Sequence, residues 1–460
     1  MHFLDAIASL PTHTMLCLIM ALAVAFAFEF INGFHDTANA VTTVIYTRTL
    51  KATPAVLYSG LLNFIGVLCG GTAIAFGIVN LLPVDLLLEH SSNAALVMVL
   101  SLLISGVAWN LGTWWFGLPV SSSHTLIGSI LGVGVANSLL EGNGLAGVNW
   151  HKAAEVGAAL LFSPLLGFTL AAAGLALCRL LVPDPELYQP PHDDKPPPRW
   201  IRAILILTCG GVSYAHGSND GQKGMGLVLL VLVGFMPFAY ALNTADPTLA
   251  ERTLKATEDI EAEYQSQGLA LSTAQQDDIA TIRTMLAGIR SFSELPSEER
   301  WLARLAIFRL KKQTDDYLAA NEELHGLLYP PVSRLSEAVE YVPLWVMVCT
   351  ALALGLGTTI GYKRIVVTVA EKIGKTHLTY AQGAVAESVA AGTILLAAFA
   401  GVPVSTTHVL SSGVAGTMVA NRSGVQAGTL KKIGLAWLFT MPASMLLAAL
   451  LFFLGRALFL

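Results

Sequence analysis

One polar stretch within an apolar run decides how this chain must fold: Phe28-Glu29-Phe30-Ile31-Asn32-Gly33-Phe34-His35-Asp36-Thr37-Ala38-Asn39-Ala40. The apolar run begins near Met15 and resumes at Val41. Because about 20 apolar residues cross a bilayer, these polar side chains are expected at membrane depth. Ionisable groups are costly there and usually functional. The central glycine predicts a helix that breaks and restarts, with its backbone lining a cavity.

A related stretch lies in the second half of the chain: Ser213-Tyr214-Ala215-His216-Gly217-Ser218-Asn219-Asp220-Gly221-Gln222-Lys223-Gly224. In both stretches an aspartate follows a glycine by three residues. Two interrupted polar segments at corresponding positions of two halves are typical of a transporter's binding site.

The composition is that of a membrane protein. Of 460 residues, 54% are hydrophobic and 12% are charged, against about 25% charged in an ordinary soluble domain. This predicts an all-α polytopic membrane protein whose surroundings are the lipid bilayer, with no nucleic-acid partner. The five cysteines are scattered singly through apolar segments, so we interpret them as packing residues.

The apolar segments form an internal repeat. About ten follow one another in two sets of five: 14–46, 53–79, 93–115, 119–138 and 153–182, then 201–241, 342–362, 377–400, 404–421 and 432–459. Each set consists of a broken span, two spans, a short span and a final span. The short spans open with nearly the same sequence, Gly117-Leu118-Pro119-Val120-Ser121-Ser122-Ser123-His124-Thr125 and Gly401-Val402-Pro403-Val404-Ser405-Thr406-Thr407-His408-Val409.

An odd number of spans in each half predicts an inverted repeat, because the second half must then insert upside down. The loop charges agree with this orientation. Basic residues gather on one side, at Arg48, Lys51, Lys195, Arg199, Arg202, Lys363, Arg364, Lys372, Lys375, Arg422, Lys431 and Lys432, whereas the opposite short loops contain only Lys152. The positive-inside rule therefore places both termini outside the cytoplasm.

The predicted domains follow from these boundaries. Residues 1–182 form the first membrane repeat, and 183–200 a proline-rich cytoplasmic linker. Residues 201–242 begin the second membrane repeat and 341–460 complete it. Between them, residues 243–340 form a hydrophilic insert, which we expect to be helical and periplasmic.

The two Ser/Thr clusters are expected to bind an anion. Proline and a hydroxyl residue start each short helix, so its free N–H groups and positive dipole end face the membrane interior. A helix start of this kind binds oxyanions. The candidate ligands are Ser121, Ser122, Ser123, Thr125, Ser405, Thr406 and Thr407. The alternative is that the hydroxyls only cap their helices.

His124 and His408 close the two clusters at equivalent positions. Each is either held by a backbone carbonyl or a titratable group beside the substrate, since histidine changes charge near neutral pH. His35 and His216 are weaker candidates, because they do not correspond in the repeat.

Asp36 and Asp220 form an acidic pair across the repeat. Aligning them pairs His35 with Asn219, and Asn39 with Lys223. Both acids can cap a half-helix, but a serine or asparagine would do so at lower cost in hydrocarbon. A cation or proton site accounts for the carboxylates. Lys223 either pairs with Asp220 or offers its ammonium to the anion.

With these motifs the chain resembles the bacterial Pit-type low-affinity inorganic phosphate transporters of the phosphate permease family. The residues that carry the resemblance are 33–40, 217–224, Trp109-Asn110-Leu111-Gly112-Thr113-Trp114 and both Pro-Val-Ser blocks. It covers nearly all of the membrane part but not residues 243–340. The resemblance implies a secondary transporter, not an enzyme, that imports phosphate across the bacterial inner membrane.

The resemblance also implies roles for individual residues. Asp36, Asn39 and Asp220 would serve the coupling cation or proton, and the clusters 121–123 and 405–407 would contact phosphate. The wider family repeats Gly-Ala-Asn-Asp-Val-Ala-Asn-Ala in both halves, whereas this chain has His35 and Lys223 in place of asparagines. An ammonium cannot ligate sodium. We therefore expect proton coupling, with Asn219, His35, His124 and His408 as further candidates.

Several alternatives stay open from the sequence. A sulfate permease, a sodium-coupled symporter or a passive anion channel would use the same fold. A membrane metalloenzyme is disfavoured, since no His-Glu-x-x-His or comparable spacing occurs. No organic cofactor is expected. A divalent metal carried together with phosphate is compatible with Asp36 and Asp220, and homo-oligomerisation is left open.

Overall fold

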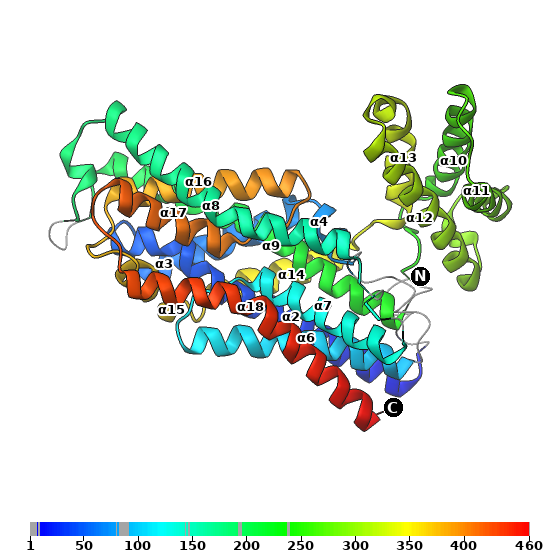
Figure 1. The fold of residues 1–460 in the computed structure, drawn as a ribbon, viewed down its shortest axis with the longest axis horizontal. Coiled ribbons are helices and arrows are strands. Elements are labelled where there is room, and N and C mark those ends of the chain that lie inside the picture. Colours follow the sequence, from blue (N-terminus) through cyan, green and yellow to red (C-terminus); the bar gives the residue numbers. More distant parts are fainter. Residues whose placement is uncertain are drawn as a thin grey trace. The chain divides into compact units, whose positions relative to one another are not determined.

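The computed structural model describes residues 7, 10–79, 81, 92–142, 144–145, 148–191, 196–236 and 240–459. Within these ranges the chain is helical and contains no β-strand, only an isolated bridge between Gly374 and Val425 (Figure 1). It divides into two compact units. The larger contains residues 17–231 and 344–460, and the smaller contains residues 1–16 and 232–343.

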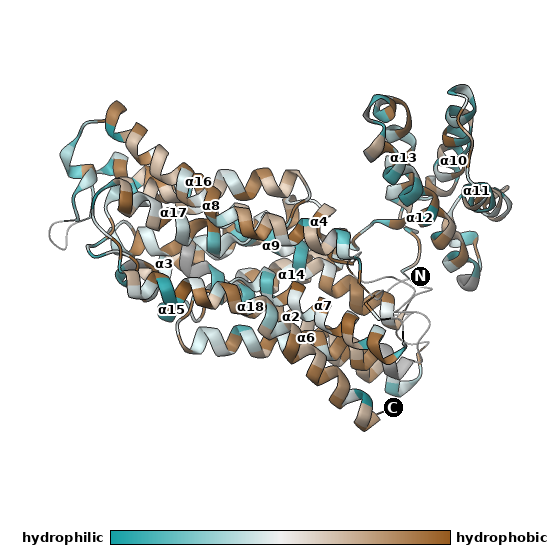
Figure 2. Cartoon of the chain, viewed as in Figure 1, coloured by the Kyte–Doolittle hydropathy of each residue, from teal (hydrophilic) through white to brown (hydrophobic). Residues whose placement is uncertain are grey.

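The larger unit is a bundle of apolar helices. They are α2 (Thr12–Tyr46), α3 (Ala52–Cys69), α4 (Ala73–Val79), α6 (Ser92–Trp115), α7 (Ser122–Leu140), α8 (Trp150–Leu181), α9 (Arg199–Phe235), α14 (Leu344–Thr358), α15 (Lys363–Val367), α16 (Tyr380–Phe399), α17 (Thr406–Ala420) and α18 (Ala427–Phe459). A π-helical turn, Thr368–Lys372, follows α15. Many large apolar side chains of these helices are exposed, as a lipid-facing surface requires. Hydrophobic residues, coloured brown, predominate along these helices in Figure 2.

Seven helices in the described part of the chain are long and apolar enough to cross a membrane, or eight if one bent helix pair forms a single span. Length and composition therefore identify fewer membrane-spanning helices in the described residues than the ten segments predicted from the sequence. Of the other helices, α9 carries the polar motif through its middle, and α14 and α17 have only 15 residues each. The chain is an all-α, multi-pass membrane protein.

The predicted helix breaks at the two glycine motifs are wrong. Both α2 and α9 continue through their motifs as single helices of 35 and 37 residues. The glycines serve close helix packing instead. A Cβ on Gly33 would collide with the backbone of Leu354 and Thr358 in α14, and one on Gly217 with the backbone of Asn63 in α3. Small residues allow such close approach between membrane helices.

The two halves pack against each other in matching pairs. Helix α8 packs against α17, and correspondingly α18 packs against α7. In the same way, α6 packs against α18 and α16 packs against α8. Glycines make these contacts close. Gly132 of α7 meets the Met445 backbone of α18, and Gly416 of α17 meets the Phe168 backbone of α8. Helices α7 and α17 are buried on nearly all sides as a result.

The smaller unit is a four-helix domain with its own core. Its helices are α10 (Leu249–Ser266), α11 (Thr273–Leu286), α12 (Ser297–Ala320) and α13 (His325–Val339). Ser272 and Gln275 form a capping box that starts α11. Buried Arg304 donates hydrogen bonds to the carbonyls of Ala241 and Val339, which ties the ends of the unit together. The location of residues 243–340 on the periplasmic side of the membrane remains a prediction.

The segment predicted as an extended linker contains a short 3-10 turn, Pro185–Tyr188, and the Asp184 side chain accepts the N–H of Glu186 at its start. Residues 192–195 lie outside the described residues. Helix α9 begins at Arg199, after the prolines that end the linker.

Close packing of α7 on α18 predicts that Gly132→Ala destabilises the larger unit. Overpacking a well-filled interior costs about 1–3 kcal/mol, and the methyl group would meet backbone that cannot yield. The measurement is thermal unfolding of the purified protein in detergent. Gly392→Ala in α16 is the control, because no atom lies near its Cβ position. Equal midpoints for both variants would contradict the packing argument.

Candidate functional site

The Asp36 carboxylate lies where the two short helices begin. Ser122, the first residue of α7, donates a hydrogen bond from Oγ to Asp36 Oδ2 over 2.8 Å. Thr407, in the first turn of α17, donates from Oγ1 to Asp36 Oδ1. His35 Nδ1 lies 3.3 Å from the same oxygen. Asp36 is 3% exposed, so these groups replace the water that a carboxylate would otherwise bind.

The capping of both helices explains this convergence. Ser121 and Ser405 have extended backbone conformations and accept the N–H groups of His124 and His408 over 3.2 and 3.1 Å. Each cap fixes where its helix starts and leaves the following hydroxyl residues in the first turn. The positive dipole ends of α7 and α17 therefore face the same carboxylate, Asp36.

Asp220 is the second buried acid of the site and pairs with a lysine. Lys223 Nζ lies 2.5 Å from Asp220 Oδ1, and also donates to Ser123 Oγ over 2.6 Å and to the Val404 carbonyl over 2.9 Å. A lysine ammonium has three donors, so these three contacts use all of them. Of the two sequence interpretations of Lys223, the structure shows the pairing with Asp220, and contact with an anion stays a prediction.

His216 joins the two acids. Its Nε2 lies 3.3 Å from Asp220 Oδ2 and 3.9 Å from Asp36 Oδ2. Its Nδ1 lies 2.7 Å from Asn63 Oδ1 of α3. One ligand atom from each of Asp36, His216 and Asp220 lies within 4.8 Å of the other two. Such a spacing can hold a shared proton or a small cation.

The remaining predicted residues take different positions around this cluster. Asn219 donates weakly to the Val402 carbonyl over 3.5 Å, and its Oδ1 has no hydrogen-bond partner among the described residues. Thr125 donates to the Ser121 carbonyl over 3.1 Å, so its hydroxyl is used within its own helix. Thr406 is buried at the start of α17. The Asn39 side chain lies outside the described residues.

The two motif histidines face each other. The rings of His124 and His408 have centroids 4.7 Å apart, and His408 stacks on Trp437 of α18 at 4.0 Å. His124 Nδ1 and His408 Nε2 have no hydrogen-bond partner within the described ranges. The structure therefore brings together two residues that are 284 positions apart, at the starts of α7, which packs on α18, and of α17, which packs on α8.

Sequence reasoning undervalued two residues of the cluster. The repeat makes His216 a weak candidate, yet it lies one helical turn before Asp220 and shares its face of α9. The sequence analysis does not include Asn63, although a buried polar residue in the middle of an apolar helix is itself a signal. The backbone carbonyl of Val404 carried no signal in the sequence.

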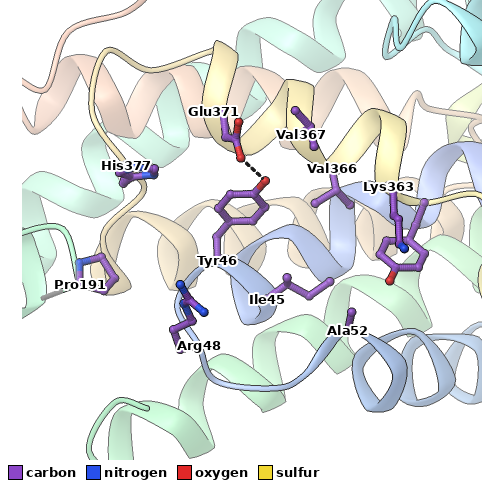
Figure 3. Close-up of a pocket in the computed structure, with 11 residues that line it drawn as sticks. Ile45, Tyr46, Arg48, Ala52, Pro191, Lys363, Val366, Val367, Glu371 and His377 are labelled. Atoms are coloured by element: carbon purple, nitrogen blue, oxygen red, sulfur yellow. Dashed lines mark hydrogen bonds between the residues drawn. The ribbon is translucent and has the colours of Figure 1, made fainter. Parts of the chain in front are cut away.

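A separate cavity of about 860 Å³ opens at the C-terminal end of α2. Figure 3 shows Tyr46 pointing at Glu371 of the π-helical turn, and their hydrogen bond is 2.5 Å long. Three cationic or titratable side chains also line it, Arg48, Lys363 and His377. None of its lining residues belongs to the cluster around Asp36.

Comparison with known proteins identifies the family. The model of the phosphate transporter family, PHO4, matches residues 32–448, a range that includes every group of the cluster. The chain belongs to the phosphate transporter family. It is 39% identical to the low-affinity inorganic phosphate transporter PitA of Escherichia coli K12, over 98% of this chain and 99% of that one. It is 28% identical to a probable low-affinity inorganic phosphate transporter of Bacillus subtilis, over 96% of this chain and 98% of that one.

One solved structure has the same fold. It is titled "The sodium-dependent phosphate transporter", and it matches with a TM-score of 0.63 at 20% identity. The match covers 96% of this chain and 99% of that chain. The family match and the identity to PitA confirm the resemblance inferred from the two glycine motifs and the Pro-Val-Ser blocks, and these relatives are named as transporters rather than enzymes.

The pairing of Asp220 predicts that Lys223→Met destabilises the protein. Removing one partner of a buried ion pair costs about 3–5 kcal/mol, and His216 can offset part of that loss. The double variant Asp220→Asn/Lys223→Met should recover stability, because no buried charge is left unpaired. Thermal unfolding of both variants in detergent measures this. A double variant that is less stable than Lys223→Met would refute the pairing argument.

Proposed function

We propose that this transporter imports inorganic phosphate together with protons across the bacterial inner membrane. The observation that carries the proposal is the convergence of hydroxyl donors from α7 and α17 on the single carboxylate of Asp36. A carboxylate and a phosphate oxyanion accept the same kind of hydrogen bond. Donors that bind Asp36 are therefore donors that can bind phosphate.

Competition for these donors supplies a coupling mechanism. While Asp36 is ionised, Ser122 and Thr407 are held by its oxygens. Protonation of Asp36 removes its charge and weakens both charge-assisted bonds. The two hydroxyls, together with the helix dipoles behind them, are then available to phosphate. Proton binding and phosphate binding favour each other in this scheme.

Lys223 gives a second point of coupling. Its three donors are occupied by Asp220, Ser123 and Val404, so it must give up a contact before it can bind an anion. Protonating Asp220 weakens the strongest of these contacts and lets the ammonium turn toward phosphate. A lysine at this place also opposes a sodium ion, because two cations repel strongly in a low dielectric.

The packing of the two halves supports alternating access. If α7 corresponds to α17 and α8 to α18, replacing each helix by its counterpart turns the packed pair α8–α17 into the packed pair α18–α7. An inverted repeat would require this correspondence. The cavity at the end of α2 supports a cytoplasmic route, because Arg48 and Lys363 would attract an anion leaving the site. On this scheme the bond between Tyr46 and Glu371 crosses that route.

A divalent metal carried with phosphate is a further part of this proposal. The spacing of Asp36, His216 and Asp220 suits a small cation, and phosphate oxygens would complete its shell from the side of the serine cluster. Unlike a free sodium ion, such a metal arrives with an anion whose negative charge offsets the repulsion from Lys223. The metal would then be cargo rather than a resident cofactor. Uptake of labelled metal at a fixed ratio to phosphate is the expected sign of it.

We expect phosphate uptake into proteoliposomes to persist without sodium and to collapse on addition of a protonophore. The reason is the Lys223 ammonium beside Asp220, which leaves protons as the coupling ions. The measurement is accumulation of labelled phosphate under an imposed pH gradient, with sulfate as a competing anion. An absolute sodium requirement with no effect of the protonophore would return the chain to a sodium-coupled mechanism.

The shared donors predict weaker phosphate binding in Ser122→Ala and Thr407→Ala. Losing one donor in a buried polar site costs about 1–3 kcal/mol, or roughly a tenfold or greater rise in apparent KM. The control is Ser412→Ala, because that hydroxyl donates only to the Val409 carbonyl of its own helix. Unchanged KM in both cluster variants would contradict anion binding at the helix starts.

A further inference from the structure

Glu29 is a buried carboxyl that the coupling scheme above does not use. It lies on α2, seven residues before Asp36, which is about 10 Å along a helix. The residue is 1% exposed. A carboxyl group at this depth is costly and is rarely kept without a function.

The other buried acids of the larger unit are bound by donors or cations. Asp36 and Asp220 have the partners described above, and Glu387 accepts hydrogen bonds from Thr43 and Thr208. Glu29 differs, since neither carboxylate oxygen has a hydrogen-bond partner among the described residues. Its ionised form therefore lacks the donors that stabilise the other three.

The groups beside Glu29 are neutral and can accept a hydrogen bond. Asn32, one turn later on the same face of α2, lies next to the carboxyl, and its buried Oδ1 has no hydrogen-bond partner within the described ranges. Thr350 Oγ1 of α14 is also buried without one. Gly224 of α9 leaves the space between them. A Cβ there would lie 2.5 Å from Glu29 Oε2 and 2.9 Å from Thr350 Cγ2.

The charges that face Glu29 come from α9: Asp220, His216 and Lys223. The α14 side chain beside the same glycine is neutral Thr350. The His216 ring and the Lys223 ammonium are both held by Asp220, whose own charge repels a second carboxylate. An ionised Glu29 is therefore poorly compensated, whereas a protonated Glu29 can donate its hydrogen to Asn32 Oδ1.

We propose that Glu29 binds the proton that is carried with phosphate. This inference rests on the proposed proton symport. One carboxylate oxygen takes a proton from water that reaches it from the outer side, and the new O–H group donates to Asn32. When the site opens inward, that O–H bond breaks, the proton returns to water and the carboxylate is restored. Glu29 is then the site where the transported proton enters and leaves, and that proton occupies Asp36 only while phosphate holds the hydroxyls of Ser122 and Thr407.

The test uses Glu29→Gln in the full chain, reconstituted in proteoliposomes and assayed in two ways. Exchange of labelled phosphate at equal concentrations on both sides needs no net proton movement, so it should be retained. Accumulation driven by a pH gradient should be lost, and the uptake rate should no longer vary with external pH. Glu29→Asp keeps a titratable group and should retain gradient-driven accumulation.

Glu387→Gln is the matched control, because that acid is equally buried but bound by hydroxyls on both oxygens. It should keep accumulation. The inference is overturned if Glu29→Gln still accumulates phosphate with the original pH dependence, if it loses exchange as well, or if Glu387→Gln loses accumulation to the same extent. If the unmutated protein shows no accumulation of phosphate driven by a pH gradient, the proposed symport itself is refuted.

Discussion

A carboxylate inside a membrane bundle is stable only when donors or cations replace the water around it, and this requirement arranges the centre of the protein. Asp36 draws together the starts of α7 and α17, which are otherwise distant in sequence. Asp220 fixes Lys223 and His216 on one face of α9. The two groups meet because His216 lies between both acids. The site is thus a network of buried charges in which each member needs the others.

Close packing at glycines makes that network geometrically available. Membrane helices gain no hydrophobic energy from each other, so they associate through contacts that small residues permit. Gly33 and Gly217 bring α2 and α9 against α14 and α3, which places the motif acids in the interior rather than toward lipid. The same device seats α7 on α18 and α17 on α8. Unbroken helices therefore deliver polar groups to the centre of the bundle.

The buried acids differ in their hydrogen-bond partners, and these differences suggest different roles. Asp36 and Asp220 are bound by groups that a phosphate ion would compete for, so in the proposed mechanism their state depends on substrate. Glu387 is bound by two threonines and has a structural surrounding. Glu29 lies beside neutral groups, and neither of its carboxylate oxygens has a hydrogen-bond partner within the described ranges. Four carboxyl groups in one bundle thus meet four different local environments, and their chemistry follows from those environments rather than from residue type.

The sequence by itself determined the class of protein and the candidate residues. Apolar length, the repeated Pro-Val-Ser blocks and the aspartates at membrane depth predicted an all-helical membrane transporter and most members of the cluster, because bilayer thickness and helix capping act locally. The tertiary structure decided the rest. It replaced the predicted helix breaks with close packing at Gly33 and Gly217, since only a neighbouring helix shows what a missing Cβ makes room for. It also decided that Ser122 and Thr407 share Asp36, because which donors meet which acceptor depends on contacts between helices far apart in the chain.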